Sequence, residues 1–436
     1  MATAFKINVP SSDTGLFGVK QSDAVASKLS GLLQDDMEAT LYGTGCEPAA
    51  LDKAYENNAS YQITAMDPKP KVASDLEEDY AGTYSKYVGN NANYGDFLRF
   101  YQKQIDKLGW QEVMNKYVFS DEKASKDLFE RLFSGLLHPL IQLMYGLEWE
   151  QPALIATGLA QAAIHRNAFG AFFAKIDEAA RNSSSAGKGE KRPLVELCEN
   201  VRSEQPELAQ APKFGDDDLF AALMVRLSDK SAAFMAENIA VDADNIEEEL
   251  DKMVHTCAYI AAAAAFRDSY KPKYDFFLIH HLTVTPFFVW LKSQSWVPNT
   301  TKARLLEWKL RVDAVDYISR GSPPLSVAPI RAYVPNDARA GKALATKPED
   351  LLRRFHDTPD DGHTIKTVRA LLLAQRLTAK YLDRQPRPSW LRIADEETWL
   401  KMHYALLDAV EGIPESEARF VRSAGFDEAW EAVPKL

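Results

Sequence analysis

Apolar residues recur at helical spacing along almost the whole chain, and this periodicity limits the fold more than any other feature. Between Asn93 and Phe119, apolar residues lie at positions 97, 98, 101, 105 and 108, break at Gly109 and then resume. Such spacing places them on one face of a helix. Strand signals, which are short runs of alternating apolar and polar residues, are nearly absent. The sequence therefore predicts an all-α protein.

Ordinary start and stop residues bound the other expected helices. Asp23 to Tyr42 is helical in pattern and stops at Gly43 and Gly45, while Glu47-Pro48 opens the next helix. Further helices are expected within 127–176 and near 218–238, 246–266 and 301–319.

Two polar stretches interrupt the pattern and predict long loops, at 181–193 and 335–348. Roughly the first 20 residues are expected to be flexible. Neither loop separates regions of different composition, and no fixed repeat is present. We therefore expect residues 1–436 to form a single multi-helix domain around a buried histidine-rich site.

Composition excludes several classes of function. Hydrophobic residues make up 46% of the chain and charged residues 26%, while the formal net charge is -11, which disfavours nucleic acid and anionic lipid as partners. The most apolar run, Cys257 to Phe266, is far shorter than the roughly 20 residues that span a bilayer. Cys46, Cys198 and Cys257 are widely separated, and the start of the chain lacks a secretory signal pattern. We expect a cytoplasmic protein without disulfides and without a membrane segment.

Four of the eight histidines fall in apolar segments, where a desolvated imidazole needs a partner. They are His138, His165, His280 and His363. His138 directly precedes Pro139, which predicts that its ring lies at the start of a helix. His165 has Ala162, Ala168 and Phe169 at helix-neighbour spacing, and His280 ends an apolar segment together with His281.

His363 and Lys366 are three residues apart, a spacing that brings both side chains to one helix face. A buried protonated lysine costs several kcal/mol unless it is paired or loses its proton. A neutral Lys366 can bind a metal or react with carbon dioxide to give a carbamate, although it can also pair with Asp360 or Asp361. Histidine and oxygen ligands suit iron, manganese or zinc, and an open position on iron(II) would bind dioxygen.

Other interpretations remain open at this point. Each histidine can be a hydrogen-bonded core residue, as we expect for His255, His356 and His403, which would be surface or structural residues. Asp35-Asp36 and Asp216 to Asp218 are similar to the aspartate-rich magnesium sites of helical terpene cyclases, but the partner motif of those enzymes is missing. Gly43-Thr-Gly45 follows a helix and lacks a third glycine, so no dinucleotide-binding domain is indicated. A non-catalytic helical protein that binds an aromatic metabolite is a further alternative.

Four segments of the chain together resemble the questin oxidase-like family of fungal aromatic polyketide pathways. They are LLHPLIQLMYG with the alanine-rich helix after it, YDFFLIHHLT, DYISRGSPPL and GHTIKTVRALL. The resemblance runs from about Asp35 to Leu373.

The resemblance carries His138, His165, His280, His363 and Lys366 over to family positions. It implies oxygenation of an anthraquinone-type aromatic polyketide, by Baeyer-Villiger-like oxygen insertion or by ring cleavage. It also implies dioxygen as the second substrate, non-haem iron(II) as the metal and NADPH as a candidate reductant.

The chain departs from the family pattern at two places. Asp35 and Asp36 stand where the family carries histidines, so a ligand is expected to differ at this place. Gln142 stands where a second histidine after His-Pro is common. Either an aspartate completes a histidine-carboxylate site, or this member has lost part of the site and works on a different substrate or without metal.

An aromatic substrate needs an apolar pocket with a few polar groups. Tyr145, Phe276 and Phe277 are the candidate walls of this pocket, and Arg369 is the candidate partner of a phenolate oxygen. Tyr145 and Arg369 are therefore the residues expected to act on the substrate.

Overall fold

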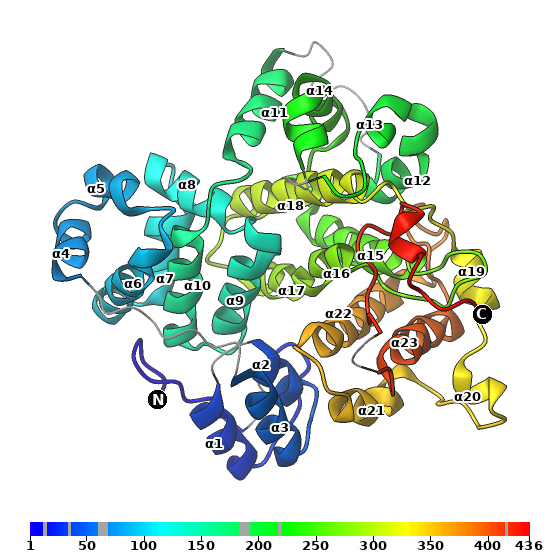
Figure 1. Cartoon of the computed structure of the whole chain (residues 1–436). Helices are drawn as coiled ribbons and strands as arrows, with labels where there is room; N and C mark the ends of the chain where they lie inside the picture. Colours follow the sequence, from blue (N-terminus) through cyan, green and yellow to red (C-terminus); the bar gives the residue numbers. More distant parts are fainter. Residues whose placement is uncertain (12–14, 34–35, 60–68, 183–191, 217–219, 415–416) are drawn as a thin grey trace. The chain divides into compact units, whose positions relative to one another are not determined.

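The computed structural model describes residues 1–11, 15–33, 36–59, 69–182, 192–216, 220–414 and 417–436. Within these ranges the regular structure is helical, and the only β-type pairings are three isolated bridges (Figure 1). The predicted all-α fold is confirmed. None of the helices in the described ranges is both long enough and apolar enough to cross a membrane.

Contacts between residues divide the chain into two compact units. Unit 1 comprises Met1–Ala171 and Pro359–Gly362, and unit 2 comprises Phe172–Thr358 and His363–Leu436. The expectation of one continuous domain stays a prediction, and each unit is described by itself.

Unit 1 is built around α10, which packs against both α9 and α6, while α4 and α5 cover the other side of α6 and α8 (Figure 1). The helices of unit 1 are α1 (Asp23–Leu32), α2 (Asp36–Gly43), α3 (Pro48–Asn58), α4 (Pro70–Glu78), α5 (Tyr80–Tyr87), η2 (Asn91–Asn93), α6 (Tyr94–Leu108), α7 (Trp110–Met114), the π-helix η3 (Asn115–Phe119), α8 (Lys123–Arg131), η4 (Gly135–Leu137), α9 (His138–Glu148) and α10 (Pro152–Ile164).

The helices of unit 2 are α11 (Gly170–Asn182, which begins in unit 1), α12 (Leu194–Glu204), α13 (Pro206–Gln210), the π-helix η5 (Ala222–Arg226), α14 (Ser228–Asn238), η6 (Ala243–Asn245), α15 (Ile246–Ala263), α16 (Phe276–Thr283), α17 (Thr285–Ser293), α18 (Asn299–Ser319), α19 (Val327–Ala332), α20 (Asn336–Arg339), η7 (Pro348–Leu351), α21 (Leu352–Asp357), α22 (His363–Thr378), η8 (Ala379–Tyr381), α23 (Glu396–Val410) and η9 (Glu428–Trp430).

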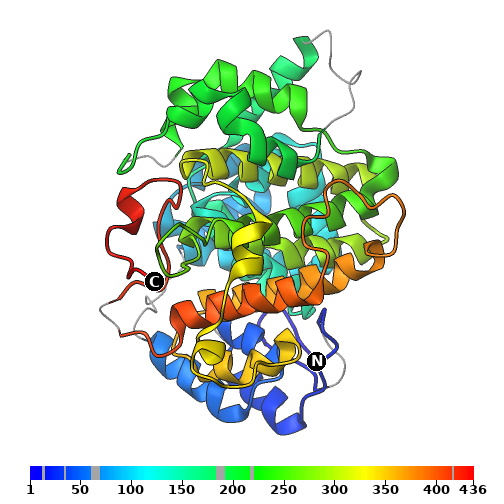
Figure 2. The same cartoon turned by 90° about the vertical axis from the view of Figure 1, so that its right-hand side faces the viewer.

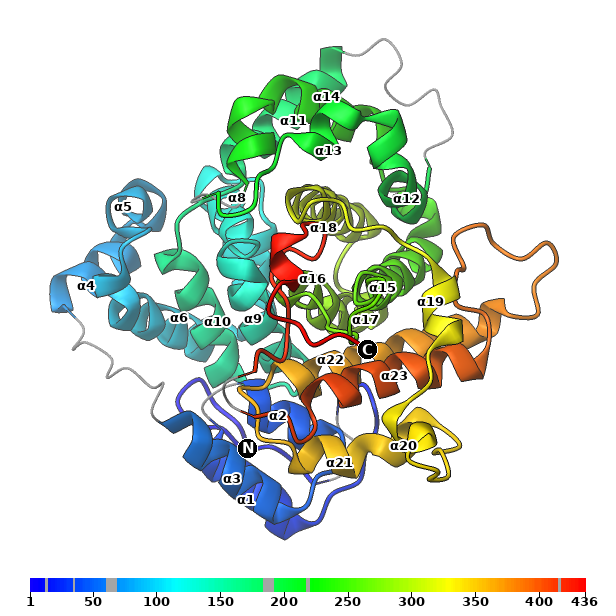
Figure 3. The same cartoon turned by 45° about the vertical axis from the view of Figure 1, so that its right-hand side comes forward.

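Helix α15 is the centre of unit 2, because it packs against α16, α17, α18 and α22. It is buried from Met253 to Ala263, where small alanines let neighbouring helices approach closely. Helix α23 packs alongside α22 (Figures 2 and 3). This packing places α16 and α22, which carry His280 and His363, against the same central helix.

Most predicted helix boundaries are confirmed within one turn, and the differences have local causes. Gly109 ends α6 with a φ of 82°, which is the left-handed conformation that glycine adopts easily. The predicted helix from Asp23 to Tyr42 is two helices, α1 and α2. The predicted loop at 335–348 contains the short helix α20. Of the other predicted loop, residues 183–191 lie outside the described ranges.

The described part of the N-terminus makes hydrogen bonds to the rest of unit 1, and its expected flexibility stays a prediction. The amide of Val9 donates to Oγ of Ser30 at 2.9 Å, and the amide of Asn8 donates to Oε1 of Gln151 at 2.8 Å. Val9 is also buried. These contacts hold the segment against unit 1, of which it is a part.

Candidate functional site

His280 lies in the short helix α16, and the residue before this helix fixes where it starts. The Asp275 carboxylate accepts hydrogen bonds from the amides of Phe277 and Leu278 at 2.8 and 3.1 Å, which is the arrangement of an N-cap. His280 is 1% exposed, and its Nδ1 atom lies 2.6 Å from the carbonyl oxygen of Phe276. Because a carbonyl oxygen only accepts, Nδ1 carries a proton, and in the neutral ring Nε2 then presents a lone pair. This is the tautomer in which Nε2 can bind a metal ion.

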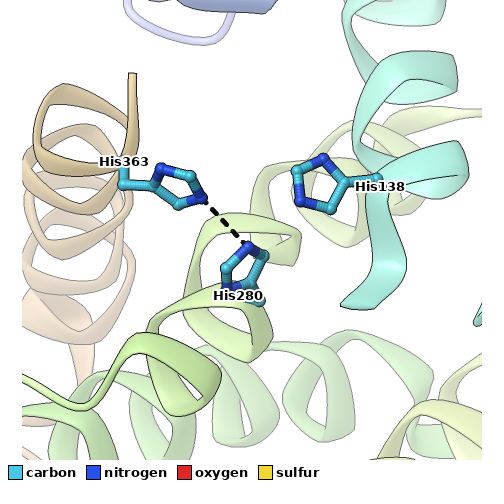
Figure 4. Close-up of side chains that lie close together, drawn as sticks. All are labelled: His138, His280 and His363. Atoms are coloured by element: carbon cyan, nitrogen blue, oxygen red, sulfur yellow. Dashed lines mark hydrogen bonds between the residues drawn. The ribbon is translucent and has the colours of Figure 1, made fainter. Parts of the chain in front are cut away.

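His363 is the first residue of α22, and its ring meets that of His280. The two Nε2 atoms are 3.1 Å apart (Figure 4). Metal–nitrogen bonds of roughly 2.1 Å put neighbouring ligand nitrogens about 3.0 Å apart in an octahedral site and about 3.4 Å apart in a tetrahedral one. The spacing between these two nitrogens therefore suits either one shared proton or one shared metal ion.

Aromatic rings enclose the histidine pair within unit 2. The centroid of the Phe276 ring lies 4.8 Å from that of His280 and 4.9 Å from that of His363. The Phe420 ring, which comes from the C-terminal segment, lies 6.4 Å from both Phe276 and His363. In such apolar surroundings, two imidazolium cations at this separation would repel each other strongly. This repulsion disfavours the doubly charged pair, and a neutral imidazole is the form that binds a metal ion.

The adjacent His281 belongs to a separate network that the sequence analysis missed. Its Nδ1 lies 2.5 Å from a carboxylate oxygen of Asp313, and its Nε2 lies 3.2 Å from Asp316, one turn further along α18. Lys309 also pairs with Asp313. Burial lowers the pKa of His281, but the two carboxylates outweigh burial and raise the pKa above its ordinary value. Both nitrogens of His281 are thus occupied. The spacing of Lys309, Asp313 and Asp316 along one helix face was the available sequence signal.

In unit 1, His138 begins α9 with Pro139 in the first turn, as predicted. The three residues before it, Gly135, Leu136 and Leu137, have φ values of 56°, 55° and 65°. Leucine is strained in this left-handed region, and strain of this kind is concentrated at functional sites. The tight turn fixes the position from which the His138 side chain leaves the start of the helix.

The expectation that His165 lies within a helix is wrong. It follows the last residue of α10 with φ of -70° and ψ of 151°, which is extended backbone. Its Nδ1 lies 2.6 Å from the carbonyl oxygen of Gln161, and a Cβ on Gly135 would lie 2.6 Å from its Nε2. No group of potential metal ligands found among the described residues includes His165. Its contacts are those of a structural residue that packs against the turn before His138.

The remaining candidate side chains are buried. Lys366 lies one turn after His363 on α22, as predicted, and is 4% exposed, while Arg369 is 1% exposed. In unit 1, the hydroxyl of Tyr145 lies 2.5 Å from Oγ1 of Thr40. The chemical roles expected for Lys366, Arg369 and Tyr145 stay predictions.

Both acidic stretches named as candidates lie partly outside the described residues. Asp35 lies outside them, as does the side chain of Asp36, so the expected replacement of a histidine ligand stays a prediction. Asp216 pairs with Arg226 at 2.9 Å, and residues 217–219 lie outside the described ranges. The pairing of Asp216 with an arginine is the contact of a structural carboxylate.

Two histidines that we left as surface or structural residues are fully buried and structural. His255 accepts hydrogen bonds at Nε2 from the amides of Arg392 and Ile393, at 2.9 and 3.2 Å. Burial lowers the pKa of His255 to about 3. The Nδ1 atom of His403 lies 2.9 Å from the carbonyl oxygen of Trp399, and burial lowers the pKa of His403 to about 4. Both rings are therefore neutral near pH 7.

Comparison with known proteins agrees with the predicted resemblance. The model of the family described as questin oxidase-like matches residues 38–371. The Baeyer-Villiger oxidase ptaJ of Pestalotiopsis fici is 30% identical over 400 residues, covering 91% of this chain and 86% of the relative. The Baeyer-Villiger monooxygenase AacuH of Aspergillus aculeatus is 31% identical over 418 residues, covering 90% and 83%. A questin oxidase of Aspergillus fumigatus is 30% identical over 395 residues, covering 90% and 86%.

Proposed function

The chain belongs to the questin oxidase-like family, with relatives named as oxidases and monooxygenases, and from this premise we propose that it oxygenates an anthraquinone-type aromatic polyketide at a non-haem iron centre. The family supports an oxidoreductase, and the names of the relatives suggest Baeyer-Villiger insertion of oxygen, with ring cleavage as the related outcome. The observation on this chain that carries the metal proposal is the 3.1 Å separation of the His280 and His363 Nε2 atoms.

The proposed ligand set extends beyond this pair. His138, the first residue of α9 in unit 1, is proposed as the third imidazole because it matches a family position. Lys366 completes the set as a neutral amine or a carbamate, because it is buried one turn from His363. His165 is left outside the set, since its contacts are structural.

The donor atoms fit iron. Imidazole nitrogens suit iron, zinc, copper and nickel, and three histidines leave coordination positions open for substrate. Iron(II) bound there would supply dioxygen activation. The chain itself supplies the orientation of His280, because the carbonyl oxygen of Phe276 holds the Nδ1 proton and turns Nε2 toward His363.

The proposed reaction requires a reductant in addition to the substrate and dioxygen. Insertion of one oxygen atom between a ketone carbon and its neighbouring ring carbon gives an ester, and the second oxygen atom leaves as water. This balance needs two electrons and two protons beyond the substrate and dioxygen. NADPH together with one proton supplies them, and we propose it as the reductant.

Four side chains have separate roles in this proposal. Phe276 and Phe420 exclude water from the histidines, which strengthens electrostatic interactions there. Arg369 binds a phenolate oxygen of the substrate, and Tyr145 forms part of the pocket wall.

Metal content tests the proposal directly. Protein purified without chelators is expected to contain about one iron per chain by elemental analysis, and His363→Ala is expected to lose most of it, since one of a small number of ligands is gone. His165→Asn is the matched control, because it removes another histidine and should leave the metal in place.

The outcome also separates the oxygenase from a metal-free binding protein. Oxygen consumption that depends on both NADPH and an anthraquinone, and that disappears in His363→Ala, supports the oxygenase. Equal metal content in His363→Ala and unmodified protein, with anthraquinone binding but no oxygen consumption, would establish the binding protein instead.

A further inference from the structure

Residues Phe420 to Gly425, here called the C-terminal strap, run against the start of α16 (Figure 3). The amide of Phe276 donates to the carbonyl oxygen of Val421 at 2.8 Å, and the amide of Val421 donates to that of Tyr274 at 3.0 Å. Val421 is 4% exposed. The strap lies beyond the residues that the family model matches, yet it is paired to the helix that carries His280.

Two further contacts anchor the far end of the strap. The amide of Ala424 donates to Oδ2 of Asp275 at 2.7 Å, and the amide of Gly425 donates to the carbonyl oxygen of Arg320 at 2.9 Å. A Cβ on Gly425 would lie 2.3 Å from the carbonyl oxygen of Gly321, so only glycine fits there. The strap is therefore held at a defined position beside the histidine pair.

Arg422 is the exposed cation of the strap. Its guanidinium carbon lies 4.1 Å from the centroid of the Phe276 ring and 5.8 Å from that of Phe277. Among the described residues no carboxylate pairs with it. A single aromatic ring, Phe276, thus separates this cation from His280 and His363.

We propose that Arg422 and Phe420 form a substrate-binding element that selects aromatic molecules carrying an anionic oxygen, either a carboxylate or a phenolate. This inference rests on the proposed function for the class of substrate and goes beyond it in naming the groups that recognise the charge. Phe420 contacts the aromatic face of the ligand, and Arg422 pairs with its anionic oxygen.

The physical reasons lie in how Arg422 is held. Stacking on Phe276 restricts the side chain, so less conformational entropy is lost when it binds an anion. The guanidinium also presents a planar set of donors that matches a carboxylate.

Two matched probes test the element by fluorescence titration of the full chain. Anthraquinone-2-carboxylate carries the anionic oxygen, and 2-(hydroxymethyl)anthraquinone is its neutral counterpart. Arg422→Gln is expected to weaken binding of the carboxylate about fivefold or more, because a charge-assisted contact is lost, and to change binding of the neutral probe less than about twofold. Arg422→Lys should keep part of the preference for the carboxylate. Phe420→Leu should weaken binding of both probes to a similar extent.

Arg387→Gln is the charge-matched control, since Arg387 is an exposed arginine of unit 2 whose guanidinium contacts only a backbone carbonyl among the described residues. The inference is overturned if Arg387→Gln weakens binding of the carboxylate probe as much as Arg422→Gln does, or if Arg422→Gln weakens binding of both probes equally. It is also overturned if the unmodified protein does not bind the carboxylate probe. Titration of 2-hydroxyanthraquinone across its ionisation distinguishes the phenolate from the carboxylate as the better ligand. We expect Arg422→Gln to leave the iron content unchanged. If only the metal proposal fails, the protein still binds the carboxylate probe and the neutral probe differently, while His363→Ala retains its metal.

Discussion

The Asp275 carboxylate accepts a hydrogen bond from the amide of Ala424 at 2.7 Å, across 149 residues of sequence, while its other oxygen caps α16. Asp275 is completely buried, and burial raises its pKa to about 6. One side chain therefore holds both the helix that carries His280 and the strap that carries Arg422.

Asp275→Ala is expected to lower the free energy of unfolding by about 2 to 4 kcal/mol, because it removes an N-cap and leaves buried amides without an acceptor. Urea unfolding followed by circular dichroism measures this. Asp395→Ala is the control, since Asp395 caps α23 but is partly exposed. It should cost about 1 kcal/mol. Equal losses in the two variants would show that Asp275 is only a cap.

The proposed ligand roles of the histidines predict opposite results for two substitutions. His280→Asn is expected to remove most of the bound iron, since its Nε2 faces that of His363 at 3.1 Å. His165→Asn is expected to retain the iron, because the His165 ring contacts the Gln161 carbonyl and Gly135. Elemental analysis of both variants, purified in parallel, provides the measurement. Loss of iron from His165→Asn would return this residue to the ligand set.

The helices of this protein could be predicted from the sequence because the buried face of an amphipathic helix requires an apolar residue every three to four positions. The same reasoning placed His280 and His363 on apolar helices but could not show that they meet, since 83 residues separate them. It misread His165, because no glycine or proline marks the end of α10 there.

The position of the strap could not be predicted from the sequence either. Phe420 to Gly425 has no helical or alternating pattern, and its position depends on backbone hydrogen bonds with Tyr274 and Phe276, which any residue could make. Asp275 before an apolar helix is a readable N-cap signal, but its second bond to Ala424 is a tertiary contact without a local signature.

Stability should fall as the pH is lowered through 6.5, because His255 is buried in its neutral form. The pKa of His255 is lowered to about 3 in the folded protein, so the unfolded chain binds a proton below pH 6.5 that the folded chain does not. Because of this one residue, the free energy of unfolding is expected to be about 2 kcal/mol lower at pH 5 than at pH 7. His403, with a pKa lowered to about 4, acts in the same direction.

His255→Gln tests this contribution, since a glutamine oxygen can still accept from the amides of Arg392 and Ile393 but does not titrate. The difference in unfolding free energy between pH 7 and pH 5, measured in urea, should be about 2 kcal/mol smaller in the variant. An unchanged pH dependence would mean that His255 is protonated in the folded protein.

Gly425→Ala is expected to displace the strap. The added Cβ would meet the carbonyl group of Gly321 and the carbonyl oxygen of Arg320, at 2.3 to 2.6 Å, and these are backbone atoms that cannot rotate away. We expect a loss of about 1 to 3 kcal/mol in unfolding free energy together with weaker binding of anthraquinone-2-carboxylate.

Gly31→Ala is the control, because Gly31 lies in the last turn of α1 with no atom within 4 Å of the new Cβ. There the change should be neutral or stabilising, by up to about 1 kcal/mol. If Gly425→Ala kept full affinity for the carboxylate despite lower stability, the position of the strap would not matter for recognition, and Arg422 would be acting through charge alone.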